Sequence, residues 1–412
     1  MKRSSSLGPI PFGFPSPILV QLQPSKVILF SMGAIKNFPN PRVPAELSNG
    51  SIVLGSQMES NNDQESALGK IDTIGRLAVS EAGKQPPVVI VWRNVLVFIY
   101  LHLAALYGLY LCFTDVTWAT LAWSYALFIF GGFGITGGAH RLWAHRCYKA
   151  KWPLRVIAAV GQTIALQNDI YVWSRDHRVH HKFSETDADP HNARRGFFFA
   201  HVGWLLCRKH PEVMRRGKTV DVSDLLQDPI VVYQRKFYIP LLIIFCFAMP
   251  TLVPWYFWGE SLRTSFFVAS ILRYVITLNA TWLVNSAAHI WGTHPYDKGI
   301  NPSENRFVAF ITSGEGWHNY HHVFPWDYKA SELGNYGTNT TRAIIDFCAW
   351  LGLAYDLKSV PEKVVYNRVR RTGDGSHPFA LQDNQFRLDD DMQMEEEQFT
   401  EITPAAEKQR SA

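Results

Sequence analysis

Nine of the fifteen histidines fall into four short clusters, which are the clearest chemical signal in the sequence. In chain order, the clusters contain His140 and His145; His177, His180 and His181; Asn285 and His289; and His318, His321 and His322. On a helix, positions i, i+3 and i+4 lie on one face, so each HxxHH triplet can present three imidazoles to one point. Asn285 and His289 share a face for the same reason. This spacing predicts a metal site.

The number of clustered histidines indicates more than one metal ion. One HxxHH motif is weak evidence, because most histidines are hydrogen-bonded structural residues, but two triplets and two further pairs favour metal binding. A zinc site takes three or four protein ligands, so nine histidines exceed one zinc site and suit two octahedral or near-octahedral ions. We assign the remaining six histidines to structural or surface positions: His102, His191, His201, His210, His294 and His377.

Four long apolar runs must position these clusters. They cover residues 95–113, 116–139, 238–258 and 265–288, and each is long enough to cross about 30 Å of hydrocarbon as a helix. Only a few residues join the first two runs, and only a few join the last two. The sequence therefore predicts an all-α integral membrane protein with four transmembrane helices in two hairpins. A cytosolic helical cap would carry the di-iron site.

Basic residues near the span ends indicate the orientation. Those closest to the second and third spans are Arg141, Arg146, Lys149, Lys151, Arg235 and Lys236. Short cytoplasmic loops carry an excess of Lys and Arg, so we expect both termini and residues 140–235 on the cytoplasmic side. Residues 156–166 are apolar but too short to span, and crossing would separate the first two histidine clusters. An interfacial or re-entrant helix is therefore expected there.

The membrane setting narrows the choice of metal. Imidazole binds iron, copper and zinc alike. A redox site in a membrane needs a metal that activates oxygen, and a two-metal centre can supply two electrons at once. These considerations favour iron.

The chain divides into three parts by composition. Residues 1–88 are rich in Pro, Ser, Gly and Asn, which predicts a disordered leader, and repeated prolines argue against a signal peptide. Residues 89–358 hold the spans and the histidine clusters and form the expected membrane and catalytic domain. Residues 359–412 are polar and acidic, and a solvated, unfolded tail is expected.

Composition excludes several other classes of protein. Charged residues make up 18% of the chain, below the roughly 25% of typical soluble domains. The five cysteines are odd in number and include no CxxC pair, so neither a disulfide framework nor a cysteine zinc site is indicated. The net charge of +5 comes without a basic stripe that interleaves with aromatics, so nucleic-acid binding is not expected.

The clusters, in this order and spacing, resemble those of the integral-membrane acyl-CoA delta-9 desaturases, the stearoyl-CoA desaturase family of animals. The resemblance runs from about Pro87 to Pro361 and is closest to an insect member. Its motifs read GAHRLWAH, RDHRVHHKFSETDADPHN, RRGFFFAHVGWLLCRKHPEV, LNATWLVNSAAH and GEGWHNYHHVFPWDY.

The resemblance implies two non-haem irons held by all nine clustered histidines, with Asn285 contributing through a water. It also implies electrons from cytochrome b5 and its reductase, O2 as co-substrate, and a location in the endoplasmic reticulum membrane. By position, the residues implied to hold the CoA head are Arg93, Asn94, Arg175, Asp176, Arg208 and Lys209. Basic side chains are suitable partners for CoA phosphates, and the alternative for Arg208 and Lys209 is that they are juxtamembrane anchors.

The resemblance also implies an acyl tunnel with a bend. Four residues match the bend: Gln167, Trp173, Thr281 and Trp282. A bend matters because a saturated chain has many equivalent methylenes, and only geometry can choose among them. Stepping back by four from His140 gives Thr136, Gly132 and Phe128, the last roughly 18 Å away along an α-helix. The family's chain-length residues match Gly132 and Phe128, although Phe128 could instead pack against lipid or a neighbouring helix.

The resulting hypothesis is an acyl-CoA delta-9 desaturase that places a cis double bond at C9–C10 of palmitoyl- or stearoyl-CoA. An alternative keeps the chemistry but changes its position or outcome, as in a delta-11 desaturase or a di-iron hydroxylase. A third alternative is a membrane metal-binding or transport protein, for which ligands along a pore would be typical. The clusters lie at span ends and in loops, which argues against a conduction path.

Overall fold

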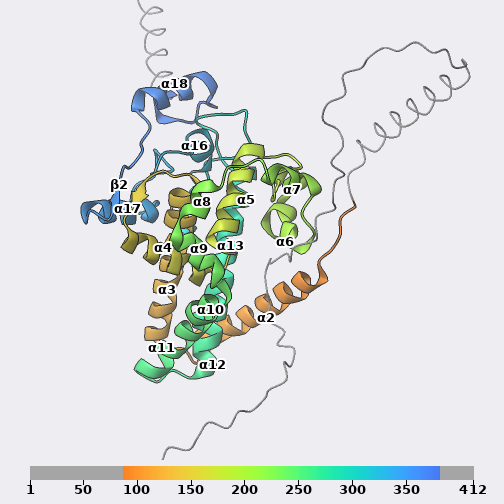
Figure 1. Ribbon diagram of the computed structural model, residues 1–412, viewed down its shortest axis with the longest axis vertical. Helices are drawn as coiled ribbons and strands as arrows, with labels where there is room; N and C mark the ends of the chain where they lie inside the picture. Colours follow the sequence, from red (N-terminus) through yellow and green to blue (C-terminus); the bar gives the residue numbers. More distant parts are fainter. Residues whose placement is uncertain (1–86, 381–412) are drawn as a thin grey trace, which may run out of the picture. The chain divides into compact units, whose positions relative to one another are not determined.

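The computed structural model describes residues 87–380, and this part of the chain is mostly helical, with almost no sheet (Figure 1). Two strands of two residues each, β1 (Lys149–Ala150) and β2 (Ala354–Tyr355), form one antiparallel pair. The predicted leader up to residue 86 and the acidic run after residue 380 lie outside the described residues. The prediction of an all-α architecture is confirmed.

Four helical stretches are long and apolar enough to cross a membrane, as predicted. They are Trp92–Thr114, Trp118–Ala144, Tyr238–Trp258 and Leu262–Ile290. The first is α2 (Trp92–Thr114). The second joins α3 (Trp118–Phe133) to the π-helix η1 (Gly134–Ala144). The third comprises α10 (Tyr238–Leu242), η4 (Ile243–Ala248) and α11 (Met249–Trp258). The fourth comprises α12 (Leu262–Thr264), η5 (Ser265–Leu272), α13 (Arg273–Asn285) and α14 (Ala287–Ile290).

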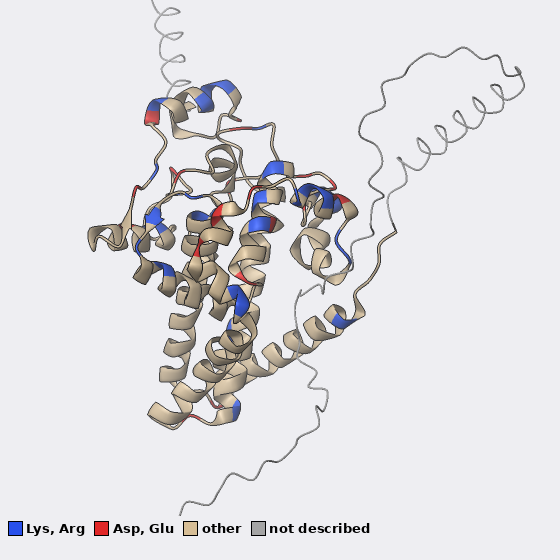
Figure 2. Ribbon diagram, in the orientation of Figure 1, with Lys and Arg blue, Asp and Glu red and all other residues tan. Residues whose placement is uncertain are grey.

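The two hairpin turns meet at the same end of the bundle. Arg263 donates to Asp115 across the turns at 2.6 Å. Glu260 accepts hydrogen bonds from the Thr117 amide and from the Thr120 hydroxyl, at 3.0 and 2.8 Å. These contacts tie the turn of one hairpin to the start of the other hairpin's second helix. Lys and Arg are concentrated towards the opposite end of the spans (Figure 2).

The fourth span is not a purely apolar run, because it contains Arg273. This side chain is 2% exposed and donates to the backbone oxygens of Ile164 and Ala269, at 2.9 and 3.1 Å. A charged residue within a span is costly unless its donors find partners inside the protein. Its contacts satisfy that condition.

Helix α4 (Trp152–Ala165) contains the short apolar segment and is not one of the four candidate spans. Gly161 of α4 and Gly134 of the second span meet so closely that a Cβ on Gly134 would lie 2.0 Å from the Gln162 nitrogen. The two helices therefore cross backbone against backbone, which fixes α4 beside η1. An interfacial position for α4 stays a prediction.

The remaining helices gather beyond the end of the spans that carries the histidines (Figure 1). Between the second and third spans lie α5 (Ile170–Phe183), η2 (Ala193–Arg195), η3 (Phe199–Gly203), α6 (Trp204–Leu206), α7 (Pro211–Gly217), α8 (Ser223–Gln227) and α9 (Pro229–Lys236). After the fourth span come α15 (Arg306–Ile311), α16 (His318–Val323), α17 (Thr340–Trp350) and α18 (Glu362–Thr372).

The prediction of an unfolded tail from residue 359 is wrong for the first part of that segment, because helix α18 forms at Glu362–Thr372. Helix α18 buries Val365 and Val369 against Tyr296, in a small apolar cluster. His377, which we had assigned to a surface or structural position, is 1% exposed, and its Nε2 lies 3.0 Å from Glu332. An amphipathic helix can pack a few apolar side chains even when its overall composition is polar, and this accounts for the error.

Candidate metal centre and cavity

The first histidine pair lies on a π-helical segment. In η1 the His145 amide donates to the His140 carbonyl at 3.0 Å, an i→i+5 bond. The wider turn of a π-helix brings residues five apart towards one side, whereas an α-helix would turn them away from each other. The two imidazole rings lie 4.9 Å apart, centroid to centroid. The π-helix therefore explains how an HxxxxH spacing can serve one site.

The other clusters lie on α5, on α14 and on α16. Helix α5 begins at Asp169, whose side chain caps the Val172 amide at 3.0 Å. His289 lies on α14, directly after the break in the fourth span at Ser286. The short helix α16 starts at His318 itself. Four separate segments of the chain thus converge on one place.

All nine predicted histidines come together, in two adjacent groups. The first contains His140, His145, His177, His181 and His321, and the second contains His180, His289, His318 and His322. Within each group the ligand atoms lie within 4.8 Å of one another. Each group has enough donors for one metal ion.

The triplets divide between the groups, so the expectation that each triplet points its three rings at one centre is wrong. On α5, His177 and His181 join the first group while His180 joins the second. On α16, His318 and His322 join the second group while His321 joins the first. Positions i and i+4 are closest in angle around a helix, whereas i+3 lies on the other side of position i. An HxxHH triplet that lies between the two histidine groups can therefore contribute ligands to both.

The epsilon nitrogens approach one another closely. The Nε2 atoms are 2.9 Å apart for His140 and His321, and 2.9 Å apart for His145 and His177. In the second group the Nε2 atoms of His318 and His289 are 3.0 Å apart. The donor set is therefore nitrogen-rich, and its ligand atoms point inward.

Carboxylates fix the opposite nitrogen of three rings. The Nδ1 atoms of His140, His180 and His289 lie 2.5, 2.9 and 2.8 Å from carboxylate oxygens of Glu315, Asp189 and Glu185, respectively. When Nδ1–H donates to a carboxylate, Nε2 carries a lone pair. The Nε2 lone pairs of these three rings point toward the other imidazoles of their groups, where a cation could accept them. The donor chemistry therefore fits metal ions in both groups.

Burial favours the neutral, metal-binding form of several of the nine imidazoles. It lowers the pKa of His145, His177 and His181 well below 6.5, and neighbouring imidazoles lower it further. Burial lowers the pKa of His318 and His322 in the same way. Neutral rings do not have to lose a proton before they bind a cation.

The partner carboxylate on the first group is ionised. Burial alone would raise the pKa of Glu315, but His140 and Arg141 lower it to about 2. Arg141 is fully buried and donates to Glu315 at 2.8 Å and to the carbonyl of Tyr328 at 3.0 Å. A chain of contacts thus runs from Arg141 through Glu315 to His140.

Sequence reasoning did not identify these supporting groups. Glu185, Asp189 and His191 follow the first triplet within ten residues, and Glu315 precedes the second triplet by three. His191, assigned above to a structural or surface position, forms a further potential group with His180 and Asp189. Short spacing from a ligand motif was the available signal, but it does not tell which acidic residue turns inward.

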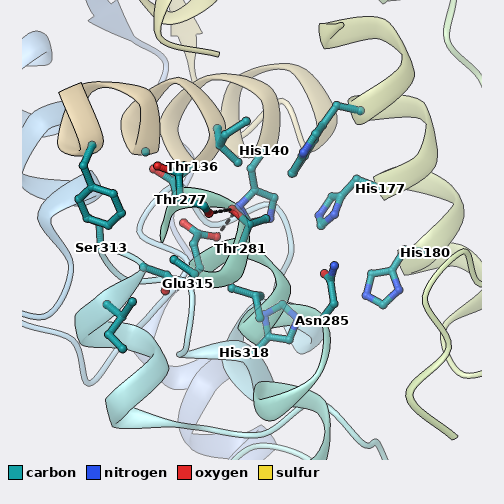
Figure 3. A pocket seen from close by; sticks show the side chains of 18 residues that line it. Thr136, His140, His177, His180, Thr277, Thr281, Asn285, Ser313, Glu315 and His318 are labelled. Atoms are coloured by element: carbon teal, nitrogen blue, oxygen red, sulfur yellow. Dashed lines mark hydrogen bonds and ion pairs between the residues drawn. The ribbon is translucent and has the colours of Figure 1, made fainter. Parts of the chain in front are cut away.

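An elongated cavity leads away from the histidines (Figure 3). It contains about 690 Å³ of space that no atom fills, including the part open to solvent. Its lining includes Phe128, Gly132, Thr136 and His140, the four residues at steps of four along the second span. Asn285 also lines this cavity. A Cβ on Gly132 would meet nothing within 4 Å, so this glycine faces open space.

Three of the four residues assigned to a bend lie together beside the histidines. Trp173 and Thr281 line the cavity. Gln167 links them, since its Nε2 donates to the Thr281 hydroxyl at 2.8 Å and its Oε1 accepts from the Trp173 indole at 3.4 Å. Trp282 instead packs its ring against Phe98 at a centroid distance of 5.4 Å.

The six residues assigned to a CoA head lie where α2 begins and where α5 meets the segment after α6. Asn94 donates to the Leu205 carbonyl at 2.8 Å, and the Arg208 amide donates to the Val89 carbonyl at 2.8 Å. Two further basic residues pair with one carboxylate. They are Arg175 and Lys209, and the carboxylate is that of Asp176. The guanidinium of Arg93 donates to the side chain of Asn94. The six residues thus form two sets: Arg93, Asn94 and Arg208 lie at the start of α2, and Arg175, Asp176 and Lys209 lie between α5 and the segment after α6.

Comparison with known proteins places these features in one family. The family model for fatty acid desaturases matches residues 115–335. The chain is 65% identical over 288 residues to an acyl-CoA delta-9 desaturase of Acheta domesticus, covering 70% of this chain and 80% of the relative. It is 60% identical over 288 residues to an acyl-CoA delta-12 desaturase of the same species, covering 70% and 81%. It is 58% identical over 287 residues to stearoyl-CoA desaturase 5 of Bos taurus, covering 70% and 85%.

The chain belongs to the fatty acid desaturase family. Family membership and four apolar helices of spanning length make it a membrane protein. The two histidine groups could each hold a metal ion, and this is consistent with a metal site.

Proposed function

We propose that this protein is an acyl-CoA delta-9 desaturase that forms a cis double bond between C9 and C10 of palmitoyl- or stearoyl-CoA. The observation that carries the proposal is that both histidine groups border an apolar cavity, which two members of each group line: His140 and His177 of the first, and His180 and His318 of the second. In the overall reaction the acyl chain loses two hydrogens. O2, two electrons and two protons then complete the balance, and two waters form.

The proposed metal is iron, with one ion in each histidine group. The first ion would be held by His140, His145, His177, His181 and His321, and the second by His180, His289, His318 and His322, with Asn285 acting through a water. When bound, the pair of irons supplies the oxidising chemistry towards O2. Glu315, Asp189 and Glu185 orient three of the rings through Nδ1. Electrons would come from cytochrome b5 and its reductase.

The cavity would position the acyl chain, and the chemistry would take place at the metal end. A saturated chain offers no functional group at C9, so the walls must hold the reacting methylenes against the metal end. Phe128 and Gly132 lie along the far part of the cavity wall and would limit the length of the methyl end. Trp173 and Thr281, joined by Gln167, would set the bend, and Trp282 would support it from its packing position against Phe98. Apolar walls also exclude water from the site.

The CoA head would bind outside the cavity, on the basic and polar residues at the start of α2, on α5 and after α6. These residues are Arg93, Asn94, Arg175, Asp176, Arg208 and Lys209. Guanidinium and ammonium groups form charge-assisted hydrogen bonds with phosphates. Asp176, already paired with Arg175 and Lys209, would hold both cations in place.

We further propose the endoplasmic reticulum membrane as the location, with both termini in the cytoplasm and residues 89–358 as the catalytic domain. Basic residues near the histidine end of the spans support this orientation. Relatives with other regiospecificity are also similar, such as an acyl-CoA delta-11 desaturase of Trichoplusia ni at 57% identity. A delta-11 or other desaturase is therefore the second candidate.

The test is expression in cells that lack their own desaturase, followed by gas chromatography and mass spectrometry of total fatty acids. We expect growth without added unsaturated fatty acid, and 9-unsaturated C16 and C18 products. A double bond at carbon 11 would favour the second candidate, and a hydroxylated product would indicate a hydroxylase. Absence of any oxidised fatty acid from a well-expressed protein would refute the proposal.

Histidine variants connect the product to the metal site. Replacing His181 or His322 by alanine removes one ligand and should abolish product while the protein still inserts. His294 is the matched control, because its ring bonds the Asn301 carbonyl and belongs to neither group. His377 is unsuitable, since it is buried against Glu332. Full activity in both ligand variants would contradict the two-metal site.

A further inference from the structure

The connection between α4 and α5 has an unusual backbone. Leu166 adopts φ 50° and ψ 56°, and Asn168 has φ 70°, so two residues with side chains occupy the left-handed region on either side of Gln167. A side chain with a Cβ strains this conformation, although asparagine tolerates it better than leucine. Such strain persists only where the surroundings impose it.

Two residues of the fourth span hold the start of this connection. Arg273 donates from Nη1 to the carbonyl of Ile164 at 2.9 Å. Its neighbour Tyr274 donates its hydroxyl to the carbonyl of Leu166 at 3.3 Å. Both side chains are buried, and both act on carbonyls at the end of α4, which the helix itself leaves without partners.

Two glutamines hold the second half of the connection between α4 and α5. Gln162 donates from its side chain to the Asn168 carbonyl at 2.5 Å. Gln234 of α9 donates to the Gln162 side chain at 2.8 Å and accepts from the Ile170 amide at 3.2 Å. Side chains therefore anchor the backbone at alternate positions, from residue 164 to residue 170.

The arginine has no partner in the metal centre. It lies in an apolar span at 2% exposure, and its donors are directed to backbone oxygens of α4, of η5 and of Cys246. An ionisable residue inside a span is costly and usually has a functional reason. Here its most direct effect is on the connection that carries Gln167.

Gln167 connects this anchored backbone to the cavity wall. Its side chain contacts Thr281 of α13 at 2.8 Å and Trp173 of α5 at 3.4 Å, and both of these line the cavity together with His140 and His177 (Figure 3). A change in the backbone at Gln167 would move the link between the two walls beside the metal end. Small displacements there change which carbon of a chain faces the centre.

We propose that Arg273, Tyr274 and Gln162 are positioning residues that hold the strained Leu166–Asn168 segment. This segment fixes Gln167, and Gln167 fixes the place along the acyl chain at which the double bond forms. The inference rests on the proposed desaturase function. It assigns the accuracy of the double-bond position to buried side chains that do not line the cavity and belong to neither histidine group.

The experiment compares Tyr274→Phe and Arg273→Lys with the wild type in the full-length protein. Tyr274→Phe removes one hydroxyl and keeps the ring, and Arg273→Lys keeps the charge but loses the fork of donors. The control is Arg263→Lys, at the exposed far end of the same span, where the partner is Asp115. Two readouts are taken: hydrogen exchange of peptides covering residues 164–170, and the positional isomers of the products, from mass spectra of their dimethyl disulfide adducts.

We expect both variants to exchange about tenfold faster over residues 164–170. We also expect the fraction of products with a displaced double bond to rise about threefold, with the control unchanged. A lower yield with the same isomer fractions would indicate a purely structural role and would overturn the inference. If the Arg273→Lys protein does not insert into the membrane, the result for Tyr274→Phe alone decides whether the inference holds. A wild type that makes no unsaturated product would refute the proposed function itself, and the inference about bond position would fall with it.

Discussion

Neutralising Glu315 tests whether the carboxylates behind the histidines contribute to the metal site. Glu315 bonds His140 Nδ1 at 2.5 Å and Arg141 at 2.8 Å, and it is buried. The substitution Glu315→Gln keeps the shape and one acceptor oxygen but removes the charge. The one remaining oxygen can accept from His140 or from Arg141, and the NH2 group then faces the other donor. Arg141 also loses its only carboxylate partner within the described residues.

The expected effect has two parts. Replacing a group that orients a metal ligand typically costs about 10- to 100-fold in metal affinity, which corresponds to roughly 1.4–2.8 kcal/mol. Removing one partner of a buried ion pair costs about 3–5 kcal/mol of stability. Arg141 keeps the carbonyls of Tyr328 and Lys329, each at 3.0 Å, so we expect the lower end of that range.

The assay is metal content per chain, measured by mass spectrometry after dialysis against graded concentrations of a chelator. Thermal unfolding of the metal-free protein measures the stability part separately. Glu212→Gln is the control, because Glu212 also pairs with an arginine, at 2.5 Å from Arg215, but on an exposed helix away from the site. If Glu315→Gln holds metal as tightly as the wild type, the carboxylate does not support the site and the reasoning fails.

Three further predictions concern the cavity, the orientation and the pH dependence. Gly132→Phe should shift products from C18 towards C16, and Phe128→Ala should admit longer chains; an unchanged ratio by gas chromatography in both would place the cavity floor elsewhere. A glycosylation tag should be modified when inserted at Ser261 but not at Ala200, and the reverse on an immunoblot would invert the topology. Burial raises the pKa of Glu304 to about 8 from 4.5, so protonated Glu304 favours the folded state, and this stability is lost as pH rises from about 4.5 to about 8. The thermal stability of Glu304→Gln should fall less steeply with pH over that interval than the stability of the wild type. Equal slopes for the two proteins would contradict the prediction.

The spans and the histidine clusters could be predicted because both are local signals. A run of about twenty apolar residues marks a span wherever the rest of the chain lies, and the predicted ends agree with the helices to within a few residues. The same holds for HxxHH, where spacing alone indicates neighbouring faces. Spacing does not give the location of the target, however. His180 and His321 therefore serve a different centre from the one their neighbours serve.

Other features depend on contacts between distant segments. Glu315 becomes a partner of His140 only because the segment before α16 meets η1, and its short spacing from the second triplet does not by itself show that its side chain turns inward. Helix α18 is polar in composition and is held by the burial of Val365 and Val369, a pattern too short to stand out from a tail. The π-helix of η1 also has no spacing rule of its own, yet it decides how His145 can join His140.

The metal site and the membrane bundle depend on each other. The ligands come from η1, α5, α14 and α16, which no continuous helix connects, so the groups form only when both hairpins and the cap have packed together. In the reverse direction, a cation bound by Nε2 atoms that lie 2.9–3.0 Å apart would join rings from different elements, so metal binding would stabilise the packing of these elements. The carboxylates behind the rings then reduce the cost of assembly, because they hold His140, His180 and His289 in the metal-binding orientation through bonds that need no metal. The fold thus prepares the site from outside, through Nδ1, and leaves the inward-facing Nε2 atoms to the ions.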